Sequence, residues 1–276
     1  MEAKRDRMSS PAGLAVNSAR VRAFVNDCLP PMLIRLFHRI HKRSQQSERP
    51  ELIWSQNRYD GNFEIDWSKT NFNRIAVINL LCTGQRCENY LEIGCHTNEC
   101  FDAVIARNKI GVDPERGGTH RLTSDQFFAE YGGVKFDIIF IDGNHTYDQV
   151  RRDLINSLRH ISVGGWIVLH DMFPRNWLEE HVPCISPVWP GEVWKVGFEL
   201  ARSSDVDFKL LKIDLGVGVL RVLKESPRIP DLRTELQAER FRYFYENIHL
   251  LPILDYQHGR DWIEQCLAQQ SRTMPK

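Results

Sequence analysis

The chain has 276 residues, of which 42% are hydrophobic and 26% are charged, an ordinary composition for a soluble globular protein with a full core. Its formal net charge is zero, which excludes a global attraction to nucleic acid, so we expect no nucleic-acid partner. The sequence has no run of eighteen apolar residues and no signal-peptide core at its N-terminus. Its seven cysteines are an odd number, typical of reduced thiols. We therefore expect a soluble, cytoplasmic protein.

Residues 1–73 are predicted to form a basic, amphipathic extension followed by a cover segment. Residues 1–43 carry nine Lys and Arg against three Asp and Glu, a net charge of +6. If helical, residues 32–43 are apolar on one side and basic on the other, which suits a weak contact with an anionic membrane surface or a partner. The alternative is a helix packed on its own domain with a solvated basic face. Residues 48–75 mix aromatic and polar residues and resemble an irregular cover.

Residues 74–225 alternate between strand and helix patterns. Strands are predicted at 89–94, 109–113, 136–142 and 166–170, and helices at 98–107, 124–130, 146–160 and 191–203. Between residues 113 and 136 there is room only for a very short strand, near 119–122. Residues 207–213 and 216–223 then form an antiparallel hairpin. The pattern predicts a doubly wound, Rossmann-like α/β fold with a mostly parallel sheet and one reversed strand.

Residues 226–276 are predicted to form a C-terminal helical extension. Its aromatic and aliphatic side chains indicate a face for packing or for dimerisation, so a homo-oligomer is one interpretation. These side chains are Phe241, Tyr243, Phe244, Ile248 and Leu250.

Polar clusters fall at the carboxyl ends of four predicted strands, where open parallel sheets bind their ligands. They are Glu92 to Asn98, Asp113, Asp142 to His145, and His170-Asp171. Four such placements together favour one crevice that binds a ligand.

The first two clusters suit a nucleoside. Gly94 allows the backbone to approach a ligand closely, and a following helix N-terminus attracts an anionic group such as a carboxylate. Asp113 comes 19 residues later, an offset at which an acid reaches ribose hydroxyls. The alternatives are a glycine kept for packing and a solvated loop acid. Ser124 is expected to cap the helix that it opens.

The other two clusters suit a cation and a base. Carboxylates and imidazole at adjacent strand ends hold divalent cations: two carboxylates favour Mg²⁺, and histidine shifts the preference toward Mn²⁺, Fe²⁺ or Zn²⁺. His145 is the candidate general base because imidazole titrates near neutral pH. The alternative is that His145 caps the helix at 146 and that His170 is a satisfied core histidine.

Five motifs resemble those of class I S-adenosylmethionine-dependent methyltransferases, nearest to the branch with macrocin-type sugar O-methyltransferases and catechol-type metal-dependent enzymes. They are Tyr90-Leu-Glu-Ile-Gly94, Gly111-Val-Asp-Pro114, Ser124-Asp-Gln-Phe-Phe128, Phe140-Ile-Asp-Gly-Asn-His-Thr-Tyr147 and Gly164-Gly-Trp-Ile-Val-Leu-His-Asp171. The resemblance covers residues 74 to 223 and implies a seven-stranded sheet with a reversed last strand.

The resemblance also implies roles for single residues. Glu92, Gly94 and Asp142 would line the cofactor loop, Asp113 would bind the ribose, and Ser124 and Asp125 would lie near the adenine. Asp142, His170 and Asp171 match metal-binding positions, and His145 matches the proposed base. Two residues depart from the pattern: Asn98 replaces the last glycine of the loop, and His170 replaces an Asp or Glu.

The sequence therefore predicts O-methylation of a small-molecule or sugar hydroxyl, as in natural product or glycan modification, with S-adenosylmethionine and a divalent cation such as Mg²⁺. The loop from Met172 to Gly191, with Trp177, Trp189 and Trp194 on or near it, is expected to form the acceptor wall. One alternative is an inactive methyltransferase-like scaffold that binds a partner. Another is a nicotinamide-dependent oxidoreductase, although the usual three-glycine fingerprint is missing.

Overall fold

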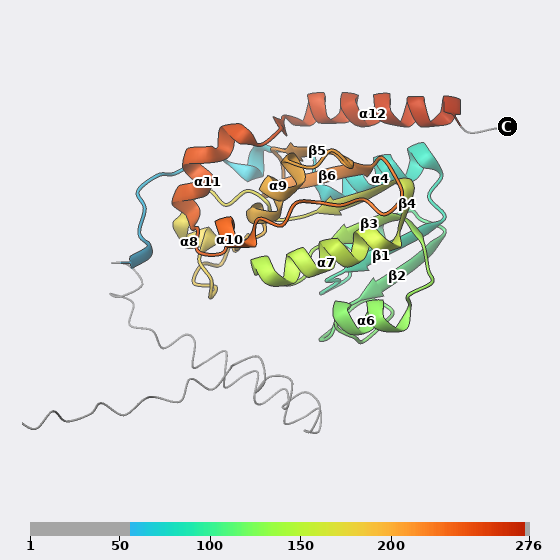
Figure 1. Ribbon diagram of the computed structural model, residues 1–276, viewed down its shortest axis with the longest axis horizontal. Helices are drawn as coiled ribbons and strands as arrows, with labels where there is room; N and C mark the ends of the chain where they lie inside the picture. The colour runs from blue at the N-terminus through green and yellow to red at the C-terminus, as the bar shows by residue number, and fades with distance from the viewer. Residues whose placement is uncertain (1–55, 274–276) are drawn as a thin grey trace, which may run out of the picture. The chain divides into compact units, whose positions relative to one another are not determined.

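The computed structural model describes residues 56–273, which belong to one compact unit (Figure 1). The predictions for the basic segment 32–43 lie outside the described residues. Among the described helices, none combines the length and the apolar character needed to cross a bilayer.

A seven-stranded sheet forms the centre of this unit, in the order β2-β1-β3-β4-β6-β5-β7. Neighbouring strands from β2 to β4 are parallel, and β6 runs antiparallel to both β4 and β5. The strands are β1 (Asn89–Ile93), β2 (Asn108–Val112), β3 (Phe136–Ile141), β4 (Ile161–Leu169), β5 (Val206–Leu211), β6 (Val217–Val222) and β7 (Ile253–Leu254). The predicted α/β fold, with seven strands and one reversed strand, is confirmed.

The seventh strand has a different origin from the one considered in the sequence. Residues 119–122 form no strand, and His120 makes a single bridge with Val112 instead. The sheet reaches seven strands because β7, from the C-terminal segment, pairs in parallel with β5. The reversed strand β6 lies inside the sheet, between β4 and β5.

Helices cover both faces of the sheet, as Figure 1 shows. On one face, α4 (Arg74–Gln85) and α12 (Tyr256–Thr273) share a hydrophobic cluster with alternate strand residues such as Ile138 and Phe140. On the other, α6 (Ser124–Glu130), α7 (Tyr147–His160) and α9 (Trp194–Ala201) pack together and against the strands. The stripe predicted for α7 is buried as expected: Tyr147, Val150, Leu154 and Leu158.

Three local predictions were wrong. The helix expected over 98–107 is only α5 (Glu99–Ala103), because the Lys109 ammonium donates to the carbonyls of Phe101 and Val104 (2.6 and 3.1 Å) and ends it there. The strand expected over 166–170 begins earlier, since β4 starts at Ile161 and includes Gly164-Gly165 at a shift in the β3–β4 register. Thr123, not Ser124, caps α6 in a capping box with Gln126.

The cover segment and the C-terminal segment meet in one aromatic cluster. Phe63 lies within 6 Å of Phe173 and Phe244 (ring centroids 5.1 and 5.8 Å), and Phe241 and Phe244 are fully buried. This face of the C-terminal segment therefore packs internally. The remaining elements are η1 (Trp67–Lys69), α8 (Trp177–Glu180), α10 (Arg233–Leu236), α11 (Phe241–Asn247) and η2 (Ile248–Leu250).

Candidate active site

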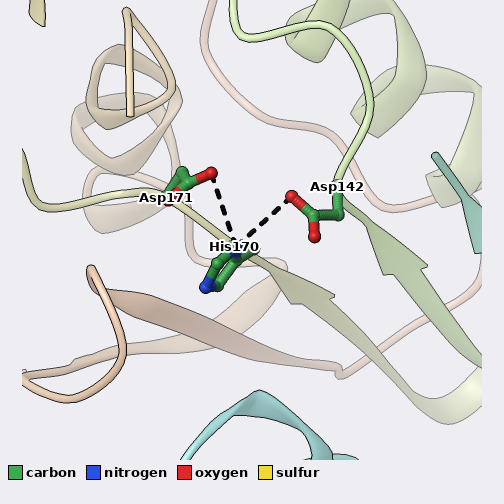
Figure 2. Close-up of side chains that lie close together, drawn as sticks. All are labelled: Asp142, His170 and Asp171. Atoms are coloured by element: carbon green, nitrogen blue, oxygen red, sulfur yellow. Dashed lines mark hydrogen bonds and ion pairs between the residues drawn. The ribbon is translucent and has the colours of Figure 1, made fainter. Parts of the chain in front are cut away.

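Asp142, His170 and Asp171 lie together at the carboxyl ends of β3 and β4 (Figure 2). The two strands are parallel neighbours with Ile141 beside Leu169, so the residues that follow them emerge side by side. Nδ1 of His170 is 3.3 Å from Oδ1 of Asp142 and 3.4 Å from Oδ2 of Asp171. The structure thus brings together the three residues predicted to bind a metal.

His145 joins this cluster through one edge of its ring. Its Nε2 lies 3.6 Å from Oδ1 of Asp142 and 3.4 Å from Oδ2 of Asp171, while Nδ1 lies 2.6 Å from the carbonyl oxygen of Trp189. Thr146 occupies the N-cap position of α7, so the alternative in which His145 caps that helix is wrong.

Backbone contacts hold His145 from the other side. The Glu192 N–H donates to the His145 carbonyl oxygen (2.8 Å), and the Glu192 side chain accepts from the backbone N–H of Tyr147 (3.1 Å). Gly191 fits so closely that an added Cβ would lie 2.4 Å from the same carbonyl oxygen. The imidazole is therefore fixed by residues 189–192 as well as by its own helix.

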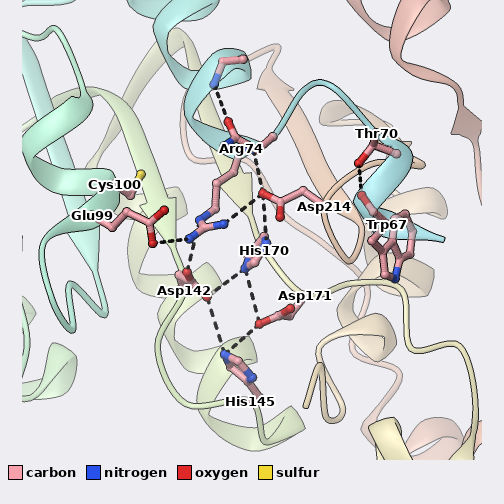
Figure 3. Close-up of polar contacts among 12 residues, drawn as sticks. Trp67, Thr70, Arg74, Glu99, Cys100, Asp142, His145, His170, Asp171 and Asp214 are labelled. Carbon is pink, nitrogen blue, oxygen red and sulfur yellow. Dashed lines mark hydrogen bonds and ion pairs between the residues drawn. The ribbon is translucent and has the colours of Figure 1, made fainter. Parts of the chain in front are cut away.

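Arg74 and Asp214 complete the cluster, and sequence analysis missed both (Figure 3). Oδ2 of Asp214 accepts hydrogen bonds from the backbone N–H and from Nη1 of Arg74 (2.9 and 3.0 Å) and lies 3.4 Å from Nε2 of His170. Asp214 follows β5, which is parallel to β4, so a polar residue after a fifth strand was a usable signal. The sequence signal for Arg74 was weaker: a helix that leads into β1 must begin near the carboxyl edge of the sheet.

The cluster is a mutually stabilising ion network. Burial opposes ionisation of Asp142, but His170 and His145 outweigh it and hold the pKa of Asp142 well below its usual range. Burial opposes the charged form of His145 too, yet Asp142 and Asp171 raise its pKa to about 9. The same two carboxylates raise the pKa of His170 well above its ordinary value, against the effect of burial. The carboxylates therefore favour the protonated form of both imidazoles.

The donor set fits a divalent cation. Asp142, His170 and Asp171 each offer one ligand atom, and these atoms all lie within 4.8 Å of one another. Oδ1 of Asp171 is buried without a hydrogen-bond partner, which leaves a carboxylate oxygen for a ligand. Asp214 faces the far nitrogen of His170, as the outer carboxylate does in carboxylate–histidine–metal arrangements.

Gly94 and Glu92 lie on and beneath the turn that follows β1. Gly94 has φ +90°, and an added Cβ would lie 2.1 Å from the Asp142 carbonyl oxygen, so the turn presses against the end of β3. Glu92 is only 1% exposed and accepts a hydrogen bond from the Tyr90 hydroxyl (2.6 Å). Burial raises the pKa of Glu92 to about 7.

Asp113 links the turns after β1 and β2. Its Oδ2 accepts from the backbone N–H of His96 (2.9 Å), and its Oδ1 accepts from those of Glu115 and Arg116 (2.8 and 2.9 Å). At 8% exposure it is not the solvated loop acid of the alternative interpretation. The two turns form one surface at the carboxyl edge.

Asn98 replaces a glycine without loss of the turn. It adopts φ +65°, a left-handed conformation that asparagine tolerates better than most residues, and its Oδ1 accepts from the Gly118 N–H (2.6 Å). The substitution therefore ties the loop down.

Ser124 and Asp125 contact α7 instead of the cluster. The Ser124 hydroxyl donates to Oδ1 of buried Asp153 (2.6 Å), and Asp125 pairs with Arg152 at 3.4 Å. Asp153 in turn lies beside Gly143, where an added Cβ would be 3.7 Å from its Oδ2.

The tryptophans expected on the acceptor wall divide into two kinds. Trp189 is half-buried and its ring centroid lies 5.2 Å from that of His145, so it borders the cluster. Trp177 and Trp194 are buried, and Trp194 packs against Phe244. Lys195, the residue after Trp194, is fully buried and donates to Glu192 (2.9 Å).

Residues 79–172 match a family described as a methyltransferase domain, about a third of the chain, and they include the Gly94 turn and the Asp142–Asp171 cluster. This segment is similar to a methyltransferase domain. The predicted resemblance to the class I methyltransferases, and the prediction of a methyltransferase enzyme, are confirmed by this match and by the sheet described above. No curated protein matches the chain.

Several solved structures are similar to this chain at low sequence identity. The SAH-bound methyltransferase PaMTH1 of Podospora anserina is 17% identical over 79% of this chain and 100% of its own, with a TM-score of 0.41. An O-methyltransferase of Bacillus cereus in complex with SAH is 14% identical over 74% and 97%, with a TM-score of 0.42. The MycE methyltransferase of the mycinamycin biosynthetic pathway, in complex with Mg, SAH and mycinamycin VI, is 14% identical over 79% and 69%, with a TM-score of 0.39. At these values the likenesses carry no functional argument.

Proposed function

We propose that this protein transfers a methyl group from S-adenosylmethionine to a hydroxyl group of a small molecule or a sugar, with His145 as the general base. One observation carries the proposal: the imidazole and two strand-end carboxylates meet beside the Gly94 turn, within the segment that matches a methyltransferase domain. The division into a catalytic domain at 74–225 and flanking segments is part of the same proposal.

Hydrogen bonding selects the reactive nitrogen of His145. Nδ1 lies 2.6 Å from a carbonyl oxygen, which only accepts, so this nitrogen must carry a proton in either charge state. Nε2 faces Asp142 and Asp171, and it is the atom that can gain or lose a proton at the site. This geometry supports Nε2 as the proposed base.

Asp142, His170 and Asp171 are the proposed ligands of a divalent cation. When bound, such a cation offsets the negative charge of the carboxylates, which favours neutral imidazole at His145, and lowers the pKa of a nearby acceptor hydroxyl. Oδ1 of Asp142 and Oδ2 of Asp171 lie 3.3 and 3.4 Å from Nδ1 of His170, so one possible ligand atom of each residue already lies close to the others. Little rearrangement is needed to hold the ion.

The proposed cofactor-binding residues run from the methionine end of the cofactor to its adenine end. In that order they are Gly94, Glu92, Asp142, Asp113, Ser124 and Asp125. S-adenosylmethionine supplies a methyl group activated by its sulfonium and departs as the neutral thioether, S-adenosylhomocysteine. Nε2 of His145 takes the proton of the acceptor hydroxyl as its oxygen bonds to the methyl carbon. Most of the rate acceleration then comes from alignment of the two reactants by the chain.

The loop between Met172 and Gly191 is the proposed acceptor wall, with Trp189 as its aromatic face. Trp189 is both half-exposed and adjacent to the base, whereas Trp177 and Trp194 serve the core. An aromatic face beside the base suits a sugar or another ring.

Calorimetric titration of the protein with S-adenosylmethionine, S-adenosylhomocysteine and NAD, with and without Mg²⁺, tests the proposal. Micromolar binding of S-adenosylhomocysteine, with methyl transfer to at least one hydroxyl compound from a broad acceptor panel, is the expected result. Binding without turnover on any acceptor supports the inactive scaffold, and binding of NAD alone supports the oxidoreductase. Either of these results contradicts the proposed function.

A further inference from the structure

Arg74 begins α4 at the carboxyl edge of the sheet, and its guanidinium reaches the proposed methyl-transfer site. Its Nε lies 3.8 Å from Oδ2 of Asp142 and its Nη2 lies 3.9 Å from Oε2 of Glu99, the first residue of α5 (Figure 3). Its side chain is 18% exposed.

One edge of this guanidinium lacks a hydrogen-bonded partner at normal distance. Nη1 donates to Asp214 at 3.0 Å, which anchors the side chain. Nε is buried with no hydrogen-bond partner, and the 3.9 Å between Nη2 and Glu99 is too long for a hydrogen bond. Nε and Nη2 form the planar fork that binds a carboxylate with two parallel hydrogen bonds.

The helix N-terminus expected to attract an anion at this turn is a poor site. α5 has five residues, and its first turn carries the acids Glu99 and Asp102, which oppose a negative group. The positive charge beside the Gly94 turn is provided by Arg74 instead.

The surrounding charges favour a zwitterion over a simple anion. Carboxylates at 3.8 and 3.9 Å flank the open fork, and they repel a bare anion but attract an adjoining ammonium group. Glu99, whose side chain is 72% exposed, is free to turn toward such a group. An α-amino acid carries both charges on neighbouring atoms.

We infer that the Nε–Nη2 edge of Arg74 binds the α-carboxylate of the cofactor's amino-acid portion, with the α-ammonium toward Glu99. This inference rests on the proposed function, because it assumes that the ligand is an S-adenosyl amino acid. It makes Arg74 a cofactor-binding residue, with Asp214 as the residue that positions it.

Binding of three ligands to the full chain tests the inference without any measurement of activity. The ligands are S-adenosylhomocysteine, its decarboxylated analogue, which keeps the ammonium, and 5′-methylthioadenosine, which lacks the amino-acid portion. Arg74→Gln should weaken binding of S-adenosylhomocysteine roughly 10- to 100-fold, about 1.4–2.8 kcal/mol, and should change binding of the other two less than about threefold. Arg107→Gln is the matched control, since Arg107 is an exposed arginine that precedes β2 at the opposite edge.

Arg74→Lys keeps the charge but not the fork, and it carries the test if Arg74→Gln does not fold. It should lose affinity for S-adenosylhomocysteine selectively, by a smaller factor. Equal weakening of all three ligands, or no weakening of any, overturns the role of Arg74 and leaves the proposed function standing. If the unmodified protein binds no S-adenosylhomocysteine, the proposed function fails and this inference fails with it.

Discussion

The buried carboxyl of Glu92 should make the stability of the protein depend on pH in a predictable direction. Its pKa is about 7 in the folded chain against an ordinary 4.5, so between these values the folded state holds a proton that the unfolded state has lost. Stability therefore falls as pH rises through this range, and the full penalty is present above pH 7. Over 2.5 units at 1.36 kcal/mol each, the penalty is about 3 kcal/mol, of which about 2.5 kcal/mol develops between pH 5 and pH 8.

Glu92→Gln isolates this effect because the amide oxygen can still accept from the Tyr90 hydroxyl, whereas the side chain no longer titrates. Urea unfolding followed by tryptophan fluorescence at pH 5, 6, 7 and 8 gives the free energy of unfolding of both proteins. The difference between variant and unmodified protein should move in favour of the variant by about 2.5 kcal/mol across this range. Other titrating groups, and any constant cost of the buried amide, cancel in that change.

Glu130→Gln is the control, since Glu130 is an exposed glutamate at the end of α6. Its unfolding free energy should follow that of the unmodified protein at every pH. Parallel curves for Glu92→Gln and the unmodified protein would refute the reasoning, because they would show that Glu92 titrates alike in the folded and unfolded chains.

Five further substitutions test the site. His145→Ala should lower turnover roughly 10²-fold or more with little change in S-adenosylhomocysteine affinity, and an unchanged rate would assign His145 to structure. Asp142→Ala and Asp171→Ala should abolish the dependence of activity on divalent cations, and full activity of the unmodified protein in excess chelator would remove the metal from the mechanism. Gly94→Ala should weaken S-adenosylhomocysteine binding at least about tenfold and lower the melting temperature, because its Cβ would lie 2.1 Å from the Asp142 carbonyl oxygen; normal values of both would contradict the tight turn. Asn98→Gly should destabilise the protein by about 1 kcal/mol in urea unfolding through loss of the bond to Gly118, and a stabilised variant would contradict the role of that bond.

Periodicity and strand ends were enough to predict the sheet and its central cluster. The apolar pattern of a buried strand such as 136–141 leaves little ambiguity about its secondary structure. The rule that ligands bind at the carboxyl edge then predicts from the sequence alone that Asp142 lies beside His170. The short α5 was not predictable in this way, because it ends where the Lys109 side chain competes for its carbonyl groups. β7 could not be predicted for a similar reason. It has only two residues, which are too few to show a periodicity, and only their pairing with β5 defines them as a strand.

The residues that sequence analysis missed or misplaced depend on contacts between distant segments. Asp214 is 140 residues from Arg74 in the chain, so no local pattern links them. Lysine is a residue type normally found at the surface, but Lys195 is buried, because Glu192 supplies the opposite charge one helical turn away.

The attachment of His145 to residues 189–192 has a consequence for how this enzyme can change its substrate. The carbonyl group that fixes its imidazole belongs to Trp189, the residue proposed to face the acceptor, so under the proposed function recognition and proton transfer share one piece of backbone. A new acceptor specificity obtained by rebuilding the whole loop would also rotate the base and slow the reaction. Divergence that spares the imidazole is therefore confined to loop positions that do not hold residues 189–192, because the Trp189 indole donates to the His181 carbonyl oxygen (2.8 Å) and the Gly191 N–H donates to that of Glu179 (3.0 Å).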